Sequence, residues 1–282
     1  MSDGRRLRVE VPEASPFFDG HFPGHPILPG IAHLLLAAWG LGPISGPSPL
    51  GGGGLDQGGG QEGGAPVTTA PFTAPLAEVR NLRLRRPVGP GDLLDLHLDA
   101  PSEDGTARFE LRRGAESLSQ GTVRLATEPE EALLPGAPAF PAGAGFPAPG
   151  ALVPHAPPAL LVRTVLEAAA EGAACVVEIP AASPFAAGGR APAFLGLEAA
   201  AQTAAVLESL ARTDASGPRL GYLVGVRDAR FHTPWLPVDH PLRATVRLTG
   251  SAPPLAIYET RIDTGDGREL VTGTVSTYVT AK

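Results

Sequence analysis

The chain has 282 residues, which suffices for one large domain or two small ones, and 43% of them are hydrophobic, enough for a buried core. A net charge of −7 disfavours a general nucleic-acid-binding protein. No apolar run reaches the roughly 18–20 residues that span a bilayer, and the N-terminus lacks the apolar core of a secretory signal, so we expect a cytoplasmic protein. The single cysteine, Cys175, excludes an internal disulfide and a cysteine-clustered metal site.

A stiff loop followed by a buried helix dominates the first part of the chain. Alternating apolar residues predict a strand over residues 7–11, and three prolines and three glycines make residues 19–30 a shaped loop. The Leu- and Ala-rich run from 31 to about 41 predicts a buried helix. His21 therefore lies on a rigid loop just before a helix N-terminus, where free N–H groups carry partial positive charge.

Residues 42–75 are rich in Gly and Pro and predict a surface insertion, because residues 51–64 hold too little apolar content to fold. A phosphate-binding glycine loop is disfavoured, since no Gly-Lys-Ser/Thr follows. Alternation and turn residues then predict an antiparallel sheet. Its strands are expected at 79–84, 93–98, 108–111 and 121–125.

The pattern restarts after a Pro/Gly/Ala-rich linker at 128–153. A helix is expected at 191–212, with strands at 160–165, 174–179, 220–226, 244–248, 257–262 and 274–279. With an offset of 163 residues, Pro29 falls on Pro192 and Leu35 on Glu198. The chain thus reads as two diverged α+β units, 1–127 and 154–282, arranged like a fused dimer.

Motifs in both halves resemble one enzyme family. Residues 21–30 (HFPGHPILPG) resemble the signature of the 3-hydroxyacyl-acyl-carrier-protein dehydratases, which have the hotdog fold. Residues 154–162 (PHAPPALLV) and 197–202 (LEAAAQ) are similar to two other stretches of that family. Residues 219–225 (RLGYLVG) look like the dehydratase-like subunit of aryl-polyene clusters, and PILPG in the first half like its partner subunit. The resemblance implies a double hotdog, a pseudodimer of two helix-wrapped antiparallel sheets.

Each half lacks what the other keeps. In the resembled family, each site combines a histidine from one unit with a carboxylate from its neighbour. Here the first half has His21 but Leu35 at the carboxylate position, and the second has Glu198 but Pro184 at the histidine position. The resemblance therefore implies one working site formed by His21 and Glu198, and an inert mirror site.

The expected chemistry is loss of water from a β-hydroxyacyl thioester. Imidazole titrates near neutral pH, so His21 suits the base that removes the Cα proton. Burial on an apolar helix is expected to raise the pKa of Glu198, so that it acts as the acid for the leaving hydroxyl. The Gly30 N–H is expected to polarise the thioester oxygen, a role that the resemblance also implies.

Supporting roles fall to other residues near these three. Phe22 and Pro29 are predicted to bind substrate, together with Gln202, which lies one turn after Glu198 on the same helix face. His155 is expected to shape the loop that begins the second half. A loop position is expected for His25 and a helix-packing role for His33. His21 and His25 do not predict a metal site, because Asp19 is the only other nearby ligand type.

Four arginines, Arg80, Arg83, Arg85 and Arg86, cluster on an otherwise acidic chain. They are either a solvated strand face or a weak docking surface for an acidic acyl carrier protein. The resemblance implies substrate tethered through the carrier's phosphopantetheine arm and no other cofactor. It also suggests a ketosynthase or ketoreductase of the same pathway as a further partner. We expect a monomeric pseudodimer or a higher homo-oligomer, with neither nucleic acid nor membrane as partner.

The expected function is dehydration of a 3-hydroxyacyl-carrier thioester to the trans-2-enoyl form, in fatty-acid, aryl-polyene or polyketide-type synthesis. Two alternatives stay open. One is another hotdog enzyme, a thioesterase or an enoyl hydratase. The other is a non-catalytic partner subunit of a synthase, suggested by the two replaced catalytic positions.

Overall fold

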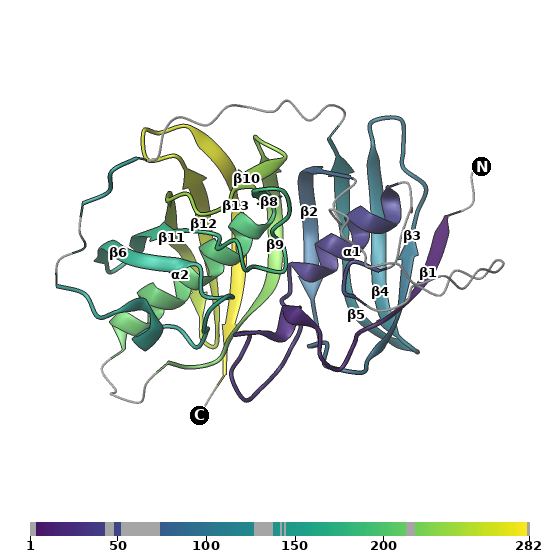
Figure 1. Cartoon of the computed structure of the whole chain (residues 1–282), viewed down its shortest axis with the longest axis horizontal. Coiled ribbons are helices and arrows are strands. Elements are labelled where there is room, and N and C mark those ends of the chain that lie inside the picture. Colours follow the sequence, from purple (N-terminus) through teal and green to yellow (C-terminus); the bar gives the residue numbers. More distant parts are fainter. Residues whose placement is uncertain are drawn as a thin grey trace.

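The computed structural model describes residues 4–42, 48–51, 74–126, 138–141, 143, 145–212 and 218–280. Most of the predicted insertion and the first part of the predicted linker lie outside these residues. The described strands form an eleven-stranded antiparallel sheet and a separate two-stranded sheet. Two α-helices pack against the large sheet, one in each half of the molecule (Figure 1).

The first half contributes one helix and five strands. Its elements are β1 (Arg5–Glu10), the short 3₁₀ helix η1 (Pro16–Phe18), α1 (Ala32–Leu41), β2 (Leu76–Leu84), β3 (Leu93–Leu98), β4 (Thr106–Arg113) and β5 (Glu116–Leu125). The strands lie in the order β1-β3-β4-β5-β2. The Leu- and Ala-rich α1 is buried along nearly its whole length, which explains why it is apolar on every side.

The second half repeats this arrangement with additions. Its elements are η2 (Pro149–Ala151), β6 (Val162–Ala169), β7 (Gly172–Val177), β8 (Arg190–Pro192), α2 (Leu195–Ala211), β9 (Gly221–Phe231), β10 (Trp235–Pro237), β11 (Leu242–Ala252), β12 (Leu255–Asp263) and β13 (Glu269–Val279). The strands continue the large sheet as β9-β13-β12-β11-β7-β6. The predicted α+β class, with one sheet-packed helix in each half, is confirmed.

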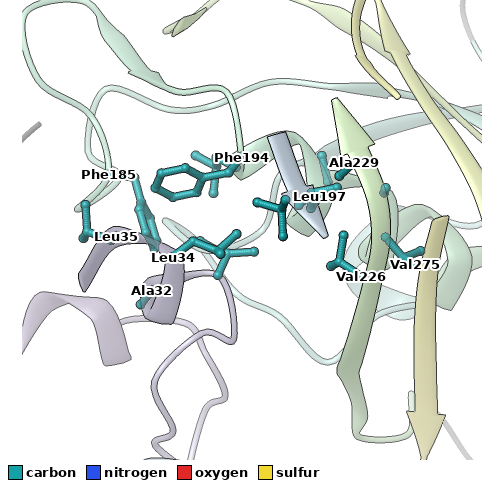
Figure 2. Packing of buried hydrophobic residues seen from close by; sticks show 14 of the residues in the cluster. Ala32, Leu34, Leu35, Phe185, Phe194, Leu197, Val226, Ala229 and Val275 are labelled. Carbon is teal, nitrogen blue, oxygen red and sulfur yellow. The ribbon is translucent and has the colours of Figure 1, made fainter. Parts of the chain in front are cut away.

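The two halves join at the middle of the sheet, where β2 pairs antiparallel with β9. Val79 lies opposite Ala229 and Leu82 opposite Val226, and all four are buried. An antiparallel pair at the centre relates the two halves by an approximate twofold axis. The apolar core is continuous across this junction, as Figure 2 shows for residues of α1, α2, β9 and β13.

The predicted repeat and the observed helices agree in position. Helix α1 begins at Ala32 and α2 at Leu195, which is the predicted offset of 163 residues. One boundary was wrong: the helix expected from residue 191 begins only at 195. Residues 190–192 instead form β8, whose Pro192 pairs with Trp235 of β10. In the described part of the chain, no helix has the length and apolarity needed to cross a bilayer.

Candidate active site

The His21 loop is fixed by its own backbone. The loop follows η1, and the His21 N–H donates to the Phe18 carbonyl at 3.0 Å. The ring nitrogen Nδ1 lies 3.0 Å from the carbonyl oxygen of Ile27. A carbonyl can only accept, so Nδ1 carries the hydrogen and Nε2 keeps a free lone pair. The ring is therefore held in the tautomer that a general base requires.

Glu198 comes from the other half of the molecule, in the first turn of α2. Its side chain is buried, and Gln202 Nε2 donates to its Oε1 at 3.2 Å. The positive end of the helix dipole also favours a carboxylate here. The nearest ligand atoms of His21, Glu198 and His155 all lie within 4.8 Å of one another. The two residues that the sequence placed in different units thus face each other.

His155 is the residue that sequence reasoning missed. Its Nε2 lies 3.3 Å from Glu198 Oε1, close enough for an ion pair. Its ring centroid is 5.1 Å from that of His21 and 4.7 Å from that of Phe22. The sequence assigned His155 a loop-shaping role, and the structure adds this contact with the Glu198 carboxylate. The signal was present, because the PHAPPALLV stretch had already been matched to the same family as the His21 loop.

One cavity of about 450 Å³ connects these groups, a size typical of small-molecule sites. Gly30 and His33 line it from the start of α1, and Ala201 and Ala205 from α2. The small side chains along α2 leave room beside Glu198. The cavity lining also includes His21, Arg85, Arg86, His155 and Glu198.

Gly30 is placed for close approach to a ligand. Its N–H makes no backbone hydrogen bond to any of the described residues. A Cβ at this position would come within 2.7 Å of the Leu84 Cδ1 atom. Glycine therefore keeps an amide donor free at the cavity wall, as an oxyanion-binding group requires.

The other predicted site residues lie around His21 and Glu198. Phe22 stacks on the His21 ring, with centroids 4.3 Å apart. Gln202 accepts from the Leu161 N–H and donates to the Ala159 carbonyl, both at 2.9 Å. Pro29 lines a minor void of about 20 Å³ on the far side of His21 and Glu198. Their binding of substrate stays a prediction.

Burial and the local charges set the ionisation of the pair. Burial lowers the pKa of His21 to about 4, although Glu198 opposes this shift, so the ring is neutral at pH 7. Burial alone would raise the pKa of Glu198, but the adjacent His155, the charge of His21 and the Gln202 hydrogen bond lower it to about 2. The expected rise in the pKa of Glu198 is thus wrong, because the sequence did not place His155 beside it.

The mirror position is apolar. Leu35 is 1% exposed, and Figure 2 shows it in one cluster with Leu34, Phe185 and Phe194. Pro184 lines the minor void behind His21 and carries no titratable group. Neither of the two residues expected at the mirror site therefore offers an acid–base group.

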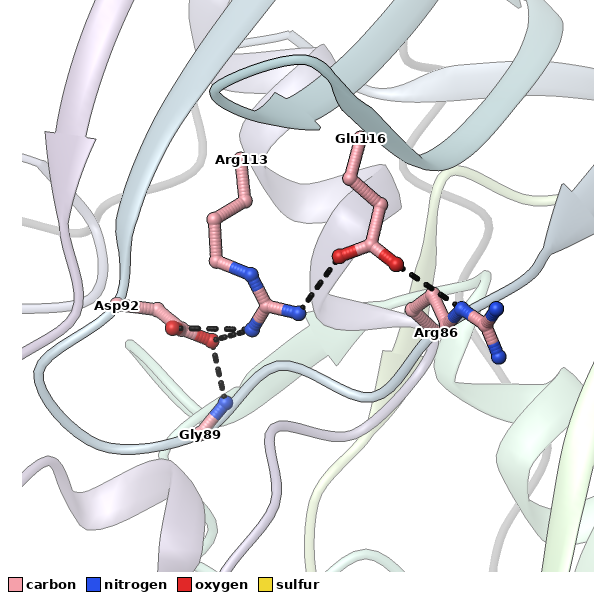
Figure 3. A network of polar contacts seen from close by, with 5 residues as sticks. All are labelled: Arg86, Gly89, Asp92, Arg113 and Glu116. Atoms are coloured by element: carbon pink, nitrogen blue, oxygen red, sulfur yellow. Dashed lines mark hydrogen bonds and ion pairs between the residues drawn. The ribbon is translucent and has the colours of Figure 1, made fainter.

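The predicted arginine cluster divides in two. Arg85 and Arg86 line the cavity, whereas Arg80 is held away from it by a bidentate contact with Glu78, both bonds 2.8 Å long. Arg83 is exposed on β2. Arg86 donates to Glu116 at 3.0 Å, within a network that includes Arg113 and Asp92 (Figure 3). This network ties the loop after β2 to the β4–β5 turn.

The cluster of His21, His155 and Glu198 also has the donor types of a metal site. However, His21 Nδ1 and Glu198 Oε1 already contact protein groups, and Nε2 of His155 lies 3.3 Å from the carboxylate. The 3.3 Å between the His155 nitrogen and the carboxylate oxygen is close to the roughly 2.6–3.2 Å reach of a proton-transferring pair. We therefore treat the cluster as an acid–base group, and the expected lack of a metal stays a prediction.

Parts of the chain resemble known dehydratases. A family model described as ApeP dehydratase matches residues 147–282, and one described as ApeI dehydratase matches residues 2–43. A 3-hydroxyacyl-[acyl-carrier-protein] dehydratase FabZ from Syntrophotalea carbinolica is 34% identical over 84 residues, 30% of this chain and 46% of that protein. The FabZ from Thermus thermophilus is 38% identical over 97 residues, 34% of this chain and 56% of the relative. The chain thus spans about half the length of these curated relatives.

Solved structures match over nearly the whole chain. The dehydratase domain of the polyketide PpsC from Mycobacterium tuberculosis has a TM-score of 0.61 and 17% identity, covering 99% of this chain and 94% of that one. A trans-AT PKS dehydratase domain from Brevibacillus brevis has a TM-score of 0.61, 15% identity and the same coverage. The double hotdog fold predicted from the motifs is confirmed, and so is the resemblance to FabZ-like and ApeI/ApeP-like dehydratases.

Proposed function

We propose that this chain converts a 3-hydroxyacyl thioester on an acyl carrier protein to the trans-2-enoyl thioester, with loss of water. The observation that carries the proposal is the meeting of His21 and Glu198, from opposite halves, at one cavity. FabZ relatives named as 3-hydroxyacyl-[acyl-carrier-protein] dehydratases support the substrate class. Fatty-acid, aryl-polyene and polyketide-type chains all fit this chemistry.

His21 is the base in this proposal. Its ring is neutral, its Nδ1 hydrogen is bound by Ile27, and its Nε2 lone pair is free to take the Cα proton of the substrate. The Gly30 N–H stabilises the charge that then develops on the thioester oxygen. Both groups line the same cavity, so one bound thioester can meet both.

Glu198 faces the leaving hydroxyl. A hydroxyl leaves as water only if it receives a proton, which is the role assigned to this carboxyl. Its pKa of about 2 means that it is ionised before the reaction. The proton must therefore reach Glu198 from a neighbouring group during the step.

The chain's partners follow from the substrate. The reaction needs no redox group and no cofactor beyond the phosphopantetheine arm of the carrier. Arg83 on β2 and Arg85 just after this strand present positive charge at the surface, and Arg85 lies at the cavity. We assign this surface to the acidic carrier, and propose a cytoplasmic enzyme that works beside the ketosynthase or ketoreductase of its pathway.

The test is an assay of the parent protein with a 3-hydroxyacyl N-acetylcysteamine thioester, following the enoyl product. We expect turnover, and a loss of at least about 100-fold for His21→Ala and for Glu198→Gln, because each removes one proton-transfer group. His25→Ala is the control, since His25 is exposed on the same loop. No product from the parent would indicate a non-catalytic subunit, and release of free thiol would indicate a thioesterase.

A further inference from the structure

His155 is a buried imidazole without a good hydrogen bond. Its residue is 8% exposed, and neither ring nitrogen has a hydrogen-bond partner of good geometry among the described residues. Buried polar atoms are nearly always paired, so an unpaired ring at a cavity calls for an explanation. The nearest charged atom is Glu198 Oε1, 3.3 Å from Nε2.

Charge balance couples this ring to Glu198. An ionised carboxylate buried without a counter-charge is costly. No Lys or Arg among the described residues forms an ion pair with Glu198, and His21 is the other titratable group that faces it. Since His21 must be neutral to act as a base, His155 is left to supply the positive charge.

The chain also holds His155 firmly in this position. The Ala156 N–H donates to the Gly20 carbonyl at 3.0 Å, which fastens the segment to the His21 loop. Gln202 bonds to the backbone of Ala159 and Leu161, which fastens the same segment to α2. One short stretch thus joins the base, the carboxylate and His155.

From this geometry we propose that His155 and Glu198 share a single proton, which His155 holds before the reaction and which passes through Glu198 to the leaving hydroxyl. The inference rests on the proposed dehydration and deepens it. His155 acts through Glu198 and need not touch the substrate.

The step balances in atoms and charge. His21 Nε2 takes the Cα proton, the Cα–Cβ double bond forms, and the Cβ–O bond breaks. The proton of His155 passes to Glu198 and from there to the departing hydroxyl, so Glu198 ends ionised as it began. The products are the enoyl thioester and water, with His21 charged and His155 neutral. Transfer of one proton from His21 back to His155, through water in the cavity, restores the starting state.

The test compares His155→Gln with the parent across pH 5–9, using the N-acetylcysteamine thioester. Glutamine keeps an N–H donor for Glu198 but cannot carry the extra proton. We expect kcat of the variant to be about 100-fold lower at pH 8 with KM within about twofold. Activity should recover as the pH falls, because Glu198 then takes its proton directly from water. His25→Gln is the matched control and should follow the parent.

Three results would overturn the inference. They are full activity of His155→Gln at pH 8, an equal loss at every pH, and loss of parent activity on treatment with a chelator, which would make the cluster a metal site. If the variant does not fold, the test uses the parent protein. Its Glu198 carboxyl resonance, assigned by comparison with Glu198→Gln, should change over the same pH range as the resonance of a histidine ring. Separate titrations would refute proton sharing, whereas an inactive parent would refute the dehydratase function itself.

Discussion

His33 shows what burial does to a single titratable side chain in this protein. It lies on α1, is 2% exposed, and its Nδ1 is 2.8 Å from the Ser119 hydroxyl. Burial lowers the pKa of His33 from 6.5 to about 4. The unfolded chain therefore binds a proton at this residue between these two pH values, while the folded chain does not.

This difference predicts how stability depends on pH. The contribution of His33 is fully present above about pH 6.5 and is lost as the pH falls towards 4, because protons then favour the unfolded state. Between pH 7 and pH 5 the free energy of unfolding should fall by about 2 kcal/mol through this residue. His33→Asn, which keeps a polar atom near Ser119 but does not titrate, should flatten that slope in urea unfolding. An unchanged slope would contradict the assignment, and His25→Asn is the control.

Strand β2 joins the two halves of the sheet and also places two arginines at the molecular surface. Its middle pairs with β9 and joins the halves, and Arg83 and Arg85 lie at and just beyond its C-terminal end. Among the described residues neither arginine forms an ion pair, unlike Arg80 and Arg86, which contact Glu78 and Glu116. The predicted cluster thus reduces to two arginines whose charge is not matched by a described acidic partner.

The docking surface is tested by neutralising these two arginines. The double variant Arg83→Gln, Arg85→Gln should raise KM for a carrier-bound substrate by about tenfold and leave KM for the N-acetylcysteamine thioester unchanged, because only the carrier is acidic. High salt should shrink the difference. Arg8→Gln, on the edge strand β1, is the control. Equal effects on both substrates would count against docking here.

Over the full chain, the two halves differ at the matching positions 35 and 198. His21, His155 and Glu198 gather at one cavity, whereas Leu35 packs among apolar side chains. Under the proposed function, a second site would need a carboxylate at position 35 and a base at position 184. The apolar Leu35 instead contributes to packing.

Restoring the carboxylate at the mirror position should therefore damage the fold without adding activity. Leu35→Glu would bury a charge beside Phe185 and Phe194, and it should lower the free energy of unfolding by about 3 kcal/mol or more. No second site should form, because Pro184 offers no base. Leu35→Met should cost less than about 1.5 kcal/mol. Denaturant unfolding and active-site titration measure both effects, and two sites per chain would refute this reading.

Much of the fold was readable from local signals. Apolar runs and turn residues located most of the strands, and Leu- and Ala-rich stretches located both helices, because these patterns depend on neighbours along the chain. The start of α2 was misplaced by four residues, since β8 forms only through its pairing with β10, which is distant in sequence. Pairing between strands that are distant in sequence cannot be seen in the residue pattern of either strand.

Residue types and their spacing were enough to predict two repeated units, a stiff His21 loop, and a histidine in one half with a carboxylate at the matching site in the other. These features depend on which residues occur and how far apart they lie in the chain, so they can be found without coordinates. The position of His155 beside Glu198 and the ionised state of this carboxyl became evident from the folded chain alone. The physical reason is that a pKa depends on charges within a few ångströms, and those neighbours come from segments more than forty residues apart.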